Sequence, residues 1–241
     1  MDLGIEGRRA VVAAASSGLG LASAAALAAE GAQVVICGRD EAKLTAAAAR
    51  VGHGCVPLVA DVGTAEGAAG FVEEAIDILG GIDILVPNGG GPPAGTFEST
   101  DVDAYPAALD ANLLAIVAMC KTAVPVMREQ RWGRVVAITS VSVRQPIPNL
   151  ILSNTARAGA TAFLKTLALE VAAEGVTVNT VQPGLHRTPR VDQLYGGEAG
   201  ALRMGDADDF GAIVTFLCSE QARFTTGVQL HVDGGSYAAL L

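Results

Sequence analysis

Two glycines that follow a short apolar run form the clearest chemical motif of the sequence. Gly18 and Gly20 follow the run Ala10–Ala14 after three intervening residues and open a helical pattern. Glycine lets the backbone turn tightly and approach a bound group, and a helix N-terminus offers unpaired N–H groups with a partial positive charge. An ordinary strand-to-helix turn also uses glycine, but the position after the first strand of a β-α-β pattern favours phosphate binding. The candidate phosphate-binding residues are Ser16, Ser17, Gly18, Leu19 and Gly20.

The end of the second apolar run indicates which dinucleotide such a turn binds. Gln33–Cys37 is followed by Gly38, Arg39 and Asp40. An acidic side chain here bonds the adenine ribose hydroxyls of NAD, whereas a basic one accommodates the 2′-phosphate of NADP. Arg39 therefore favours NADP. NAD remains the alternative if Arg39 is only a solvated charge and Asp40 caps the next helix.

Two further segments follow apolar runs in the same way. Asp61 and Val62 come after the third run, and Asn88 and Gly89 come after the fourth. Ligands of doubly wound sheets bind along the carboxyl ends of the strands. We therefore expect these four residues to line the same dinucleotide site.

Positioning these residues requires alternating strands and helices, and the hydrophobic pattern predicts such an alternation. Short Val- and Ile-rich runs are typical of strands buried on both faces, and Ala- and Leu-rich segments at helical spacing separate them. We predict a Rossmann-type doubly wound parallel α/β sheet of about seven strands, with helices on both faces and a single domain over residues 1–241. The predicted strands are Ala10–Ala14, Gln33–Cys37, Cys55–Val59, Ile82–Val86, Arg134–Thr139, Val176–Val181 and Val228–Val232. The predicted helices lie near Gly18–Glu30, Glu41–Val51, Ala65–Leu79, Val102–Arg131, Ser153–Glu174 and Asp206–Ser219.

The composition narrows the class of protein. Hydrophobic residues make up 51% of the 241 and charged residues 17%, so there is ample apolar surface for one large core. The formal net charge of -9 opposes nucleic-acid backbones, and we expect no nucleic-acid partner. The four cysteines are scattered without a companion histidine cluster. We expect no metal site and interpret them as small apolar residues in a reducing compartment.

The longest uncharged stretch of the chain, Ala10–Ala29, requires comparison with a membrane span. It is mostly alanine and is interrupted by serines and glycines, so a strand, a turn and a helix fit it better. The N-terminus shows no secretory signal pattern. We expect a cytoplasmic protein with no membrane partner.

Taken together, these motifs resemble the short-chain dehydrogenase/reductase superfamily, and especially its ketoacyl-carrier-protein reductase-like members, over essentially the whole chain. The resemblance implies a NAD(P)-dependent oxidoreductase that acts on a small-molecule carbonyl/alcohol pair, similar to a 3-oxoacyl reductase. It also adds Pro183, Gly184, His186 and Thr188 to the cofactor-binding residues. Its marks are Ser17–Gly20, Asp61–Val62, Asn88–Gly90, Asn112, Ser140, Val178–Asn179, Pro183–Gly184 with Thr188, and Val232–Gly235.

The catalytic tetrad of that family is Asn, Ser, Tyr and Lys, and this sequence departs from it at two positions. Asn112 and Ser140 match the first two members, but Ser153 stands at the tyrosine position and Arg157 at the lysine position. A serine hydroxyl is a far weaker acid than a phenol. Arginine stays protonated, so it suits holding ribose hydroxyls but not passing a proton. Loss of a positioned general acid typically costs about 10²–10⁴-fold in rate.

Two functions are compatible with these residues. In the first, an NADP-dependent oxidoreductase uses Ser140 to polarise the carbonyl oxygen, Asn112 to hold a water or the helix geometry, and Arg157 to position the ribose. A water chain, His186 or Ser153 then relays the proton. In the second, a catalytically weak or inactive dinucleotide-binding homologue acts as a sensor or interaction partner. Ser153 and Arg157 favour the second function, whereas the family resemblance favours the first, which we prefer.

The substrate pocket and the assembly follow mainly from the resemblance. We expect the irregular segment Asn88–Thr100 and the segment Arg144–Leu152 to give the pocket an apolar lining. Tyr195 falls in the loop that forms a substrate lid in the family, although an ordinary loop aromatic is the simpler interpretation. The family's dimers and tetramers join through the long helices that correspond to Val102–Arg131 and Ser153–Glu174, so we expect a homo-oligomer.

Overall fold

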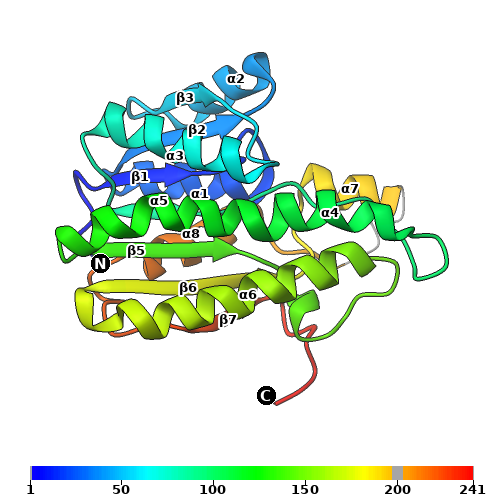
Figure 1. The fold of residues 1–241 in the computed structure, drawn as a ribbon. Coiled ribbons are helices and arrows are strands. Elements are labelled where there is room, and N and C mark those ends of the chain that lie inside the picture. The colour runs from blue at the N-terminus through cyan, green and yellow to red at the C-terminus, as the bar shows by residue number, and fades with distance from the viewer. Residues whose placement is uncertain (1, 197–202, 241) are drawn as a thin grey trace.

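One parallel sheet organises the chain (Figure 1). The computed structural model describes residues 2–196 and 203–240, and within them seven strands follow the order β3-β2-β1-β4-β5-β6-β7. The order reverses between β1 and β4, which is where doubly wound sheets bind ligands. The predicted fold class is confirmed, and each strand lies within two residues of its predicted bounds. The strands are β1 (Arg9–Val12), β2 (Gln33–Gly38), β3 (Val56–Val59), β4 (Ile84–Val86), β5 (Gly133–Ile138), β6 (Val176–Pro183) and β7 (Gln229–Val232).

Helices cover both faces of the sheet (Figure 1). Helices α1 (Gly18–Ala29), α2 (Glu41–Val51) and α8 (Ala207–Leu217) pack on one face, where Leu27, Leu44 and Phe210 are buried. The opposite face is covered by α3 (Ala65–Leu79), α5 (Ala115–Glu129) and α6 (Ile151–Val171), whose core residues include Phe71, Met119 and Leu164. These two apolar layers hold the carboxyl ends of the strands in fixed register.

The helix predicted over Val102–Arg131 is not a uniform α-helix. Its 28 residues Val102–Glu129 are long and apolar enough to cross a membrane, but α5 packs its apolar side against α3 and the sheet. It comprises a 3-10 turn η1 (Val102–Ala104), α4 (Tyr105–Leu109), a π-helical turn η2 (Asp110–Leu114) and α5. The π turn widens the helix at Asn112, which a uniform 3.6-residue period does not predict.

Two other boundaries differ from the prediction. Helix α6 begins at Ile151, two residues before Ser153, so position 153 lies inside its first turn. Tyr195, which the resemblance placed in a loop, ends a short helix, because the segment 188–206 contains α7 (Pro189–Tyr195) with a proline in its first turn. Proline at a helix start loses no intrahelical hydrogen bond. Residues 197–202 of that segment lie outside the described residues. The remaining short turns are η3 (Val141–Val143) and η4 (Ala172–Glu174).

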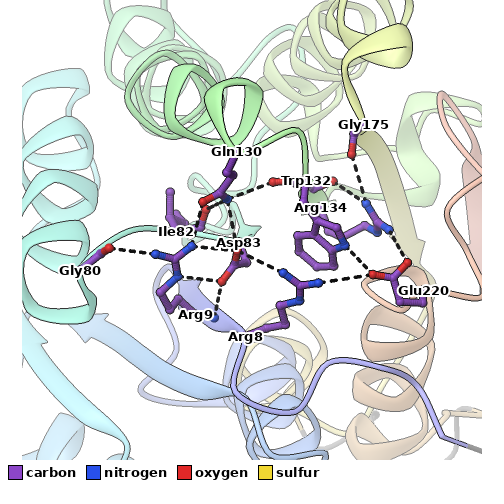
Figure 2. A network of polar contacts seen from close by, with 11 residues as sticks. Arg8, Arg9, Gly80, Ile82, Asp83, Gln130, Trp132, Arg134, Gly175 and Glu220 are labelled. Atoms are coloured by element: carbon purple, nitrogen blue, oxygen red, sulfur yellow. Dashed lines mark hydrogen bonds and ion pairs between the residues drawn. The ribbon is translucent and has the colours of Figure 1, made fainter.

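The amino ends of the central strands are tied together by a charged network (Figure 2). Asp83 accepts hydrogen bonds from the backbone N–H of Arg9 (2.9 Å), from its Nε (2.8 Å) and from its Nη2 (3.0 Å). The indole of Trp132 lies between the guanidinium groups of Arg8 (3.8 Å) and Arg134 (4.3 Å). These contacts join the starts of β1, β4 and β5 and lie at the end of the sheet opposite to the ligand-binding edge.

Candidate functional site

The carboxyl ends of the strands open into one large cleft of about 1440 Å³. Every residue that the sequence analysis named as catalytic or cofactor-binding lines this cleft except Gly20, which is buried. The segments 88–100 and 144–152, which were expected to line the substrate pocket, do so only in part. The structure therefore brings together residues from eight separate segments. They are Ser16, Ser17, Gly18, Leu19, Arg39, Asp61, Val62, Asn88, Gly89, Asn112, Ser140, Ser153, Arg157, Pro183, Gly184, His186 and Thr188.

The glycine turn presents free backbone donors to the cleft. Helix α1 begins at Gly18, whose φ of 59° lies in the left-handed region, and the Ser17 side chain does not cap the helix. The first turn contains no acidic residue, so its N–H groups and the positive end of the helix dipole face the cleft without a side-chain partner. This donor set fits the pyrophosphate of a dinucleotide.

Gly20 lies in this turn where there is no room for a side chain. A methyl group at this position would lie 2.9 Å from the carbonyl oxygen of Ala14 and 2.8 Å from Nδ2 of Asn88. That Asn88 amide donates to the carbonyl oxygens of Ala13 (3.3 Å) and Ala14 (3.2 Å), and thereby fastens the loop after β4 to the turn. Asn88 therefore organises the cleft through backbone contacts as well as lining it.

Ala14 carries a strain that the sequence did not reveal. Its φ is 47°, and a residue with a β-carbon pays about 1 kcal/mol in this left-handed region. Its N–H donates to Sγ of Cys37 at 3.3 Å. Burial raises the pKa of that thiol to about 12, so Cys37 stays protonated and the turn gains no negative charge.

The end of the cleft beside β2 separates Arg39 from Asp40. The Asp40 carboxylate caps α2 by accepting a hydrogen bond from the Lys43 N–H at 3.0 Å, as the sequence had suggested for this residue. Arg39 is exposed and lines the cleft. Asp61, on the same side, accepts a 2.9 Å hydrogen bond from the N–H of Gly63. The cationic side chain is thus the one available to a ligand in this strand-end position.

Three polar side chains lie at the opposite end of the cleft. The Ser140 hydroxyl caps η3 by accepting a hydrogen bond from the Ser142 N–H at 3.1 Å. Ser153 is 7% exposed. Asn112 is buried in the π turn and donates from Nδ2 to the Ala108 carbonyl at 3.3 Å, while its Oδ1 has no hydrogen-bond partner among the described residues. That buried acceptor can bind a water or a ligand donor.

Arg157 lies one helical turn after Ser153, and among the described residues its guanidinium bonds backbone carbonyls alone. Nη1 donates to Ile138 (3.0 Å) and Thr139 (3.4 Å), and Nη2 donates to Gly89 (3.3 Å). Burial, and secondly the charge of Arg190, lowers the pKa of Arg157 to about 10. The side chain is therefore protonated at neutral pH and acts as a fixed hydrogen-bond donor.

The structure gives different surroundings to the other candidate proton donors. His186 is 4% exposed, with Nδ1 at 3.2 Å from the Gly184 carbonyl and its ring edge-on to Phe210 at 5.2 Å between centroids. Its ring is held as a packed element of the cleft wall. Tyr195 lines the cleft, and so does Tyr237 from the C-terminal segment, which sequence reasoning did not place there.

Arg190 is the other residue that sequence reasoning missed. It lies two residues after Thr188 on α7 and lines the cleft beside the loop after β4. The only available signal was its position in the segment identified as a substrate lid.

Comparisons with known proteins agree with this architecture. A family model described as enoyl-(acyl carrier protein) reductase matches residues 13–237. The chain is 34% identical to dehydrogenase/reductase SDR family member 4 of Oryctolagus cuniculus, over 96% of this chain and 94% of that protein. It is 33% identical to the 3-oxoacyl-(acyl-carrier-protein) reductase of Haemophilus influenzae, over 97% and 99%. The structure of L-sorbose reductase from Gluconobacter frateurii, complexed with NADPH and L-sorbose, superposes with a TM-score of 0.94 at 32% identity over the whole of both chains.

Proposed function

The chain belongs to the short-chain dehydrogenase/reductase superfamily, and on that premise we propose that it is an NADP-dependent oxidoreductase acting on a carbonyl/alcohol pair. One observation carries the proposal. A single cleft contains the uncapped start of α1 and Arg39 at one end, and Ser140, Ser153 and Arg157 at the other. The first group suits a phosphorylated dinucleotide, and the second suits a polar substrate oxygen.

The cofactor end divides into three contacts. The N–H groups at the start of α1 would bind the pyrophosphate, and Gly18 would let it approach the backbone closely. Arg39 would pair with the 2′-phosphate, which a solvated guanidinium binds through two parallel donors. Arg157 would hold the ribose next to the nicotinamide. When bound, the nicotinamide supplies the hydride for carbonyl reduction or accepts it in the reverse direction.

The substrate end polarises the carbonyl group. Because the Ser142 N–H donates to the Ser140 oxygen, the Ser140 proton is free to point at the substrate oxygen. Arg157 is protonated and cannot exchange its proton readily near neutral pH, so it positions the site. We assign the proton relay to the Ser153 hydroxyl and a water held by Oδ1 of Asn112, in place of the family's tyrosine. Because serine is a weak acid, we expect slow turnover.

The test is a titration of the purified protein with NADPH and NADH, followed by cofactor fluorescence. Ketones and acyl thioesters are then added to the same samples, and cofactor oxidation is recorded. Tighter binding of NADPH, followed by oxidation, supports the proposal. Failure to bind either cofactor overturns it.

A dinucleotide-binding protein without turnover is the second candidate, and the pair Ser153 and Arg157 is the observation that favours it. Tight NADPH binding without oxidation by any added carbonyl compound, together with activation by Ser153→Tyr plus Arg157→Lys, would support this sensor function. Oxidation of NADPH by the unmodified protein in the presence of a carbonyl compound would exclude the sensor function.

We further propose a homo-oligomer in the cytoplasm. Leu114 and Leu169, at the helices through which family members are expected to join, are 44% and 72% exposed. Cys37, Cys120 and Cys218 are buried free thiols, which suit a reducing compartment. Sedimentation of a monomer at micromolar concentration would refute the oligomer.

A further inference from the structure

Two arginines that line the cleft beside the loop after β4 form no ion pair with any described carboxylate. We call Arg157 and Arg190 the arginine pair. Neither guanidinium forms an ion pair with a carboxylate within residues 2–196 and 203–240. Arg157 bonds three carbonyl oxygens, and Arg190 donates to the Pro92 carbonyl at 2.7 Å and to the Gln193 side chain at 2.9 Å. Every acceptor of the pair is formally neutral.

The two side chains bind the same short loop. Nη2 of Arg157 contacts the carbonyl of Gly89, and Nη2 of Arg190 contacts that of Pro92, three residues further on. Arg190 also lies so close to Gly91 that a β-carbon there would meet Nη2 at 2.9 Å. Although the pair comes from α6 and α7, both positive charges therefore converge on one side of the cleft.

A buried or half-buried positive charge without a counter-ion is costly, and proteins usually pair such charges. The chain has 25 acidic residues, so carboxylates are abundant. Asp61, Asp101 and Asp103 even line the same cleft, yet none forms an ion pair with either arginine. The arrangement leaves the arginine pair without a neutralising carboxylate in an acidic protein.

We propose that Arg190 binds an anionic group of the substrate, a carboxylate or a phosphate, while the positive charge of Arg157 attracts that group from its place on the backbone carbonyls. The inference rests on the proposed reductase function and narrows its substrate class to oxo acids and keto phosphates. Arg157 contacts the carbonyls of Ile138 and Thr139, directly before Ser140, so the bound anion and the polarised carbonyl share one end of the cleft. Reduction adds a hydride to the carbonyl carbon and a proton to its oxygen, NADPH becomes NADP⁺, and the anionic group is unchanged.

The test compares matched probes on NADPH-loaded protein. Acetoacetate is paired with acetoacetamide, and dihydroxyacetone phosphate with dihydroxyacetone. Binding is measured by calorimetry with and without NADPH, and oxidation of NADPH is recorded in parallel. We expect at least one anionic probe to bind about tenfold or more tightly than its neutral partner, because hydrogen bonds to a charged group are stronger than those between neutral groups. The two pairs separate a carboxylate site from a phosphate site.

Three variants test whether Arg190 causes the preference for the anionic probe. Arg190→Gln should abolish the preference for the anionic probe while the affinity for NADPH stays unchanged, and Arg190→Lys should restore part of it because the charge is kept. Arg187→Gln is the matched control, since Arg187 is exposed on the same segment and lies outside the cleft lining. Its preference should equal that of the wild type.

Equal binding of charged and neutral probes would overturn the anion site. A loss of NADPH affinity in Arg190→Gln, with the probe preference retained, would also overturn it, because the cofactor's phosphates would then be the bound anion. Failure of NADPH to bind to any form, with anionic probe binding still lost in Arg190→Gln, would refute the proposed function but support the anion site. These outcomes distinguish the two proposals.

Discussion

The Nη2 atom of Arg157 lies 3.3 Å from the carbonyl oxygen of Gly89, and this contact ties helix α6 to the loop that follows β4. The same guanidinium reaches the carbonyl of Ile138 at the end of β5. One side chain thus joins three segments where the family resemblance implies a lysine. Because a guanidinium provides several donors in a fixed plane, arginine can make all of these contacts at once.

The first prediction concerns the two departures from the family tetrad. Ser153→Tyr together with Arg157→Lys should raise the rate of carbonyl reduction by about 10²-fold or more, because a positioned phenol becomes available as general acid. The measurement is kcat/KM for each carbonyl compound that the wild-type protein reduces with NADPH. Ser153→Ala should lower the wild-type rate if the serine relays the proton. An inactive double variant with unchanged NADPH affinity would show that the pocket has diverged further.

The second prediction concerns cofactor choice. Arg39→Asp should weaken NADPH binding and favour NADH, since a carboxylate repels the 2′-phosphate and bonds the ribose hydroxyls. The ratio of the two dissociation constants should change by about tenfold or more, the scale of one charge-assisted contact. Arg50→Asp makes the same charge change at an exposed position outside the cleft lining and should leave the ratio unaltered. An equal effect of both variants would indicate long-range electrostatics in place of a contact from Arg39.

The third prediction tests the glycine turn. Gly20→Ala should lower both NADPH affinity and stability, because the new methyl group meets the Ala14 carbonyl at 2.9 Å and displaces Asn88. Overpacking of this kind costs about 1–3 kcal/mol. The readouts are urea denaturation and cofactor titration.

Gly70→Ala provides the control for that experiment. Gly70 lies in α3 with nothing within 4 Å of the added β-carbon, so its substitution should raise the free energy of unfolding by about 0.5–1 kcal/mol. NADPH affinity should not change. Unaltered NADPH affinity in Gly20→Ala would contradict the hypothesis that the pyrophosphate lies close to the backbone of this turn.

The fourth prediction concerns pH and the network at the amino ends of the strands. Burial alone would raise the pKa of Asp83, but hydrogen bonds from Arg9 and the charges of Arg9 and Arg8 outweigh it and lower the pKa. The pKa of Asp83 is therefore lower in the folded state than in the unfolded state. The ionised carboxylate stabilises the fold fully above the unfolded-state pKa of about 3.9, and this stabilisation is lost as the pH falls through the folded-state pKa.

Asp83→Asn should therefore lower the free energy of unfolding by about 2–3 kcal/mol at pH 7 and by progressively less in acid. Urea denaturation between pH 3 and pH 7, a range that brackets the unfolded value of about 3.9, provides the measurement. Asp77→Asn, at an exposed position on α3, is the control and should follow the wild-type curve. A cost that is independent of pH would mean that the carboxylate charge does not contribute.

Most of the site could be predicted because it depends on local patterns. Apolar runs specified the strands, and the residues at their carboxyl ends were then brought to one edge by the rules of parallel sheets. Arg39, Asp61 and Ser140 all lie in the cleft for that reason. The replacements at positions 153 and 157 were visible from the family resemblance, which places the tyrosine and the lysine at fixed distances from Ser140.

Tertiary structure alone decided what those residues contact. The three carbonyls bound by Arg157, the convergence of Arg190 on the same loop, and the arrival of Tyr237 in the cleft join segments far apart in the chain. The left-handed conformation of Ala14 has the same origin, because its surroundings impose a dihedral angle that alanine does not favour. Periodicity reports which face of an element is buried, whereas the partner of a polar side chain depends on how all the elements pack.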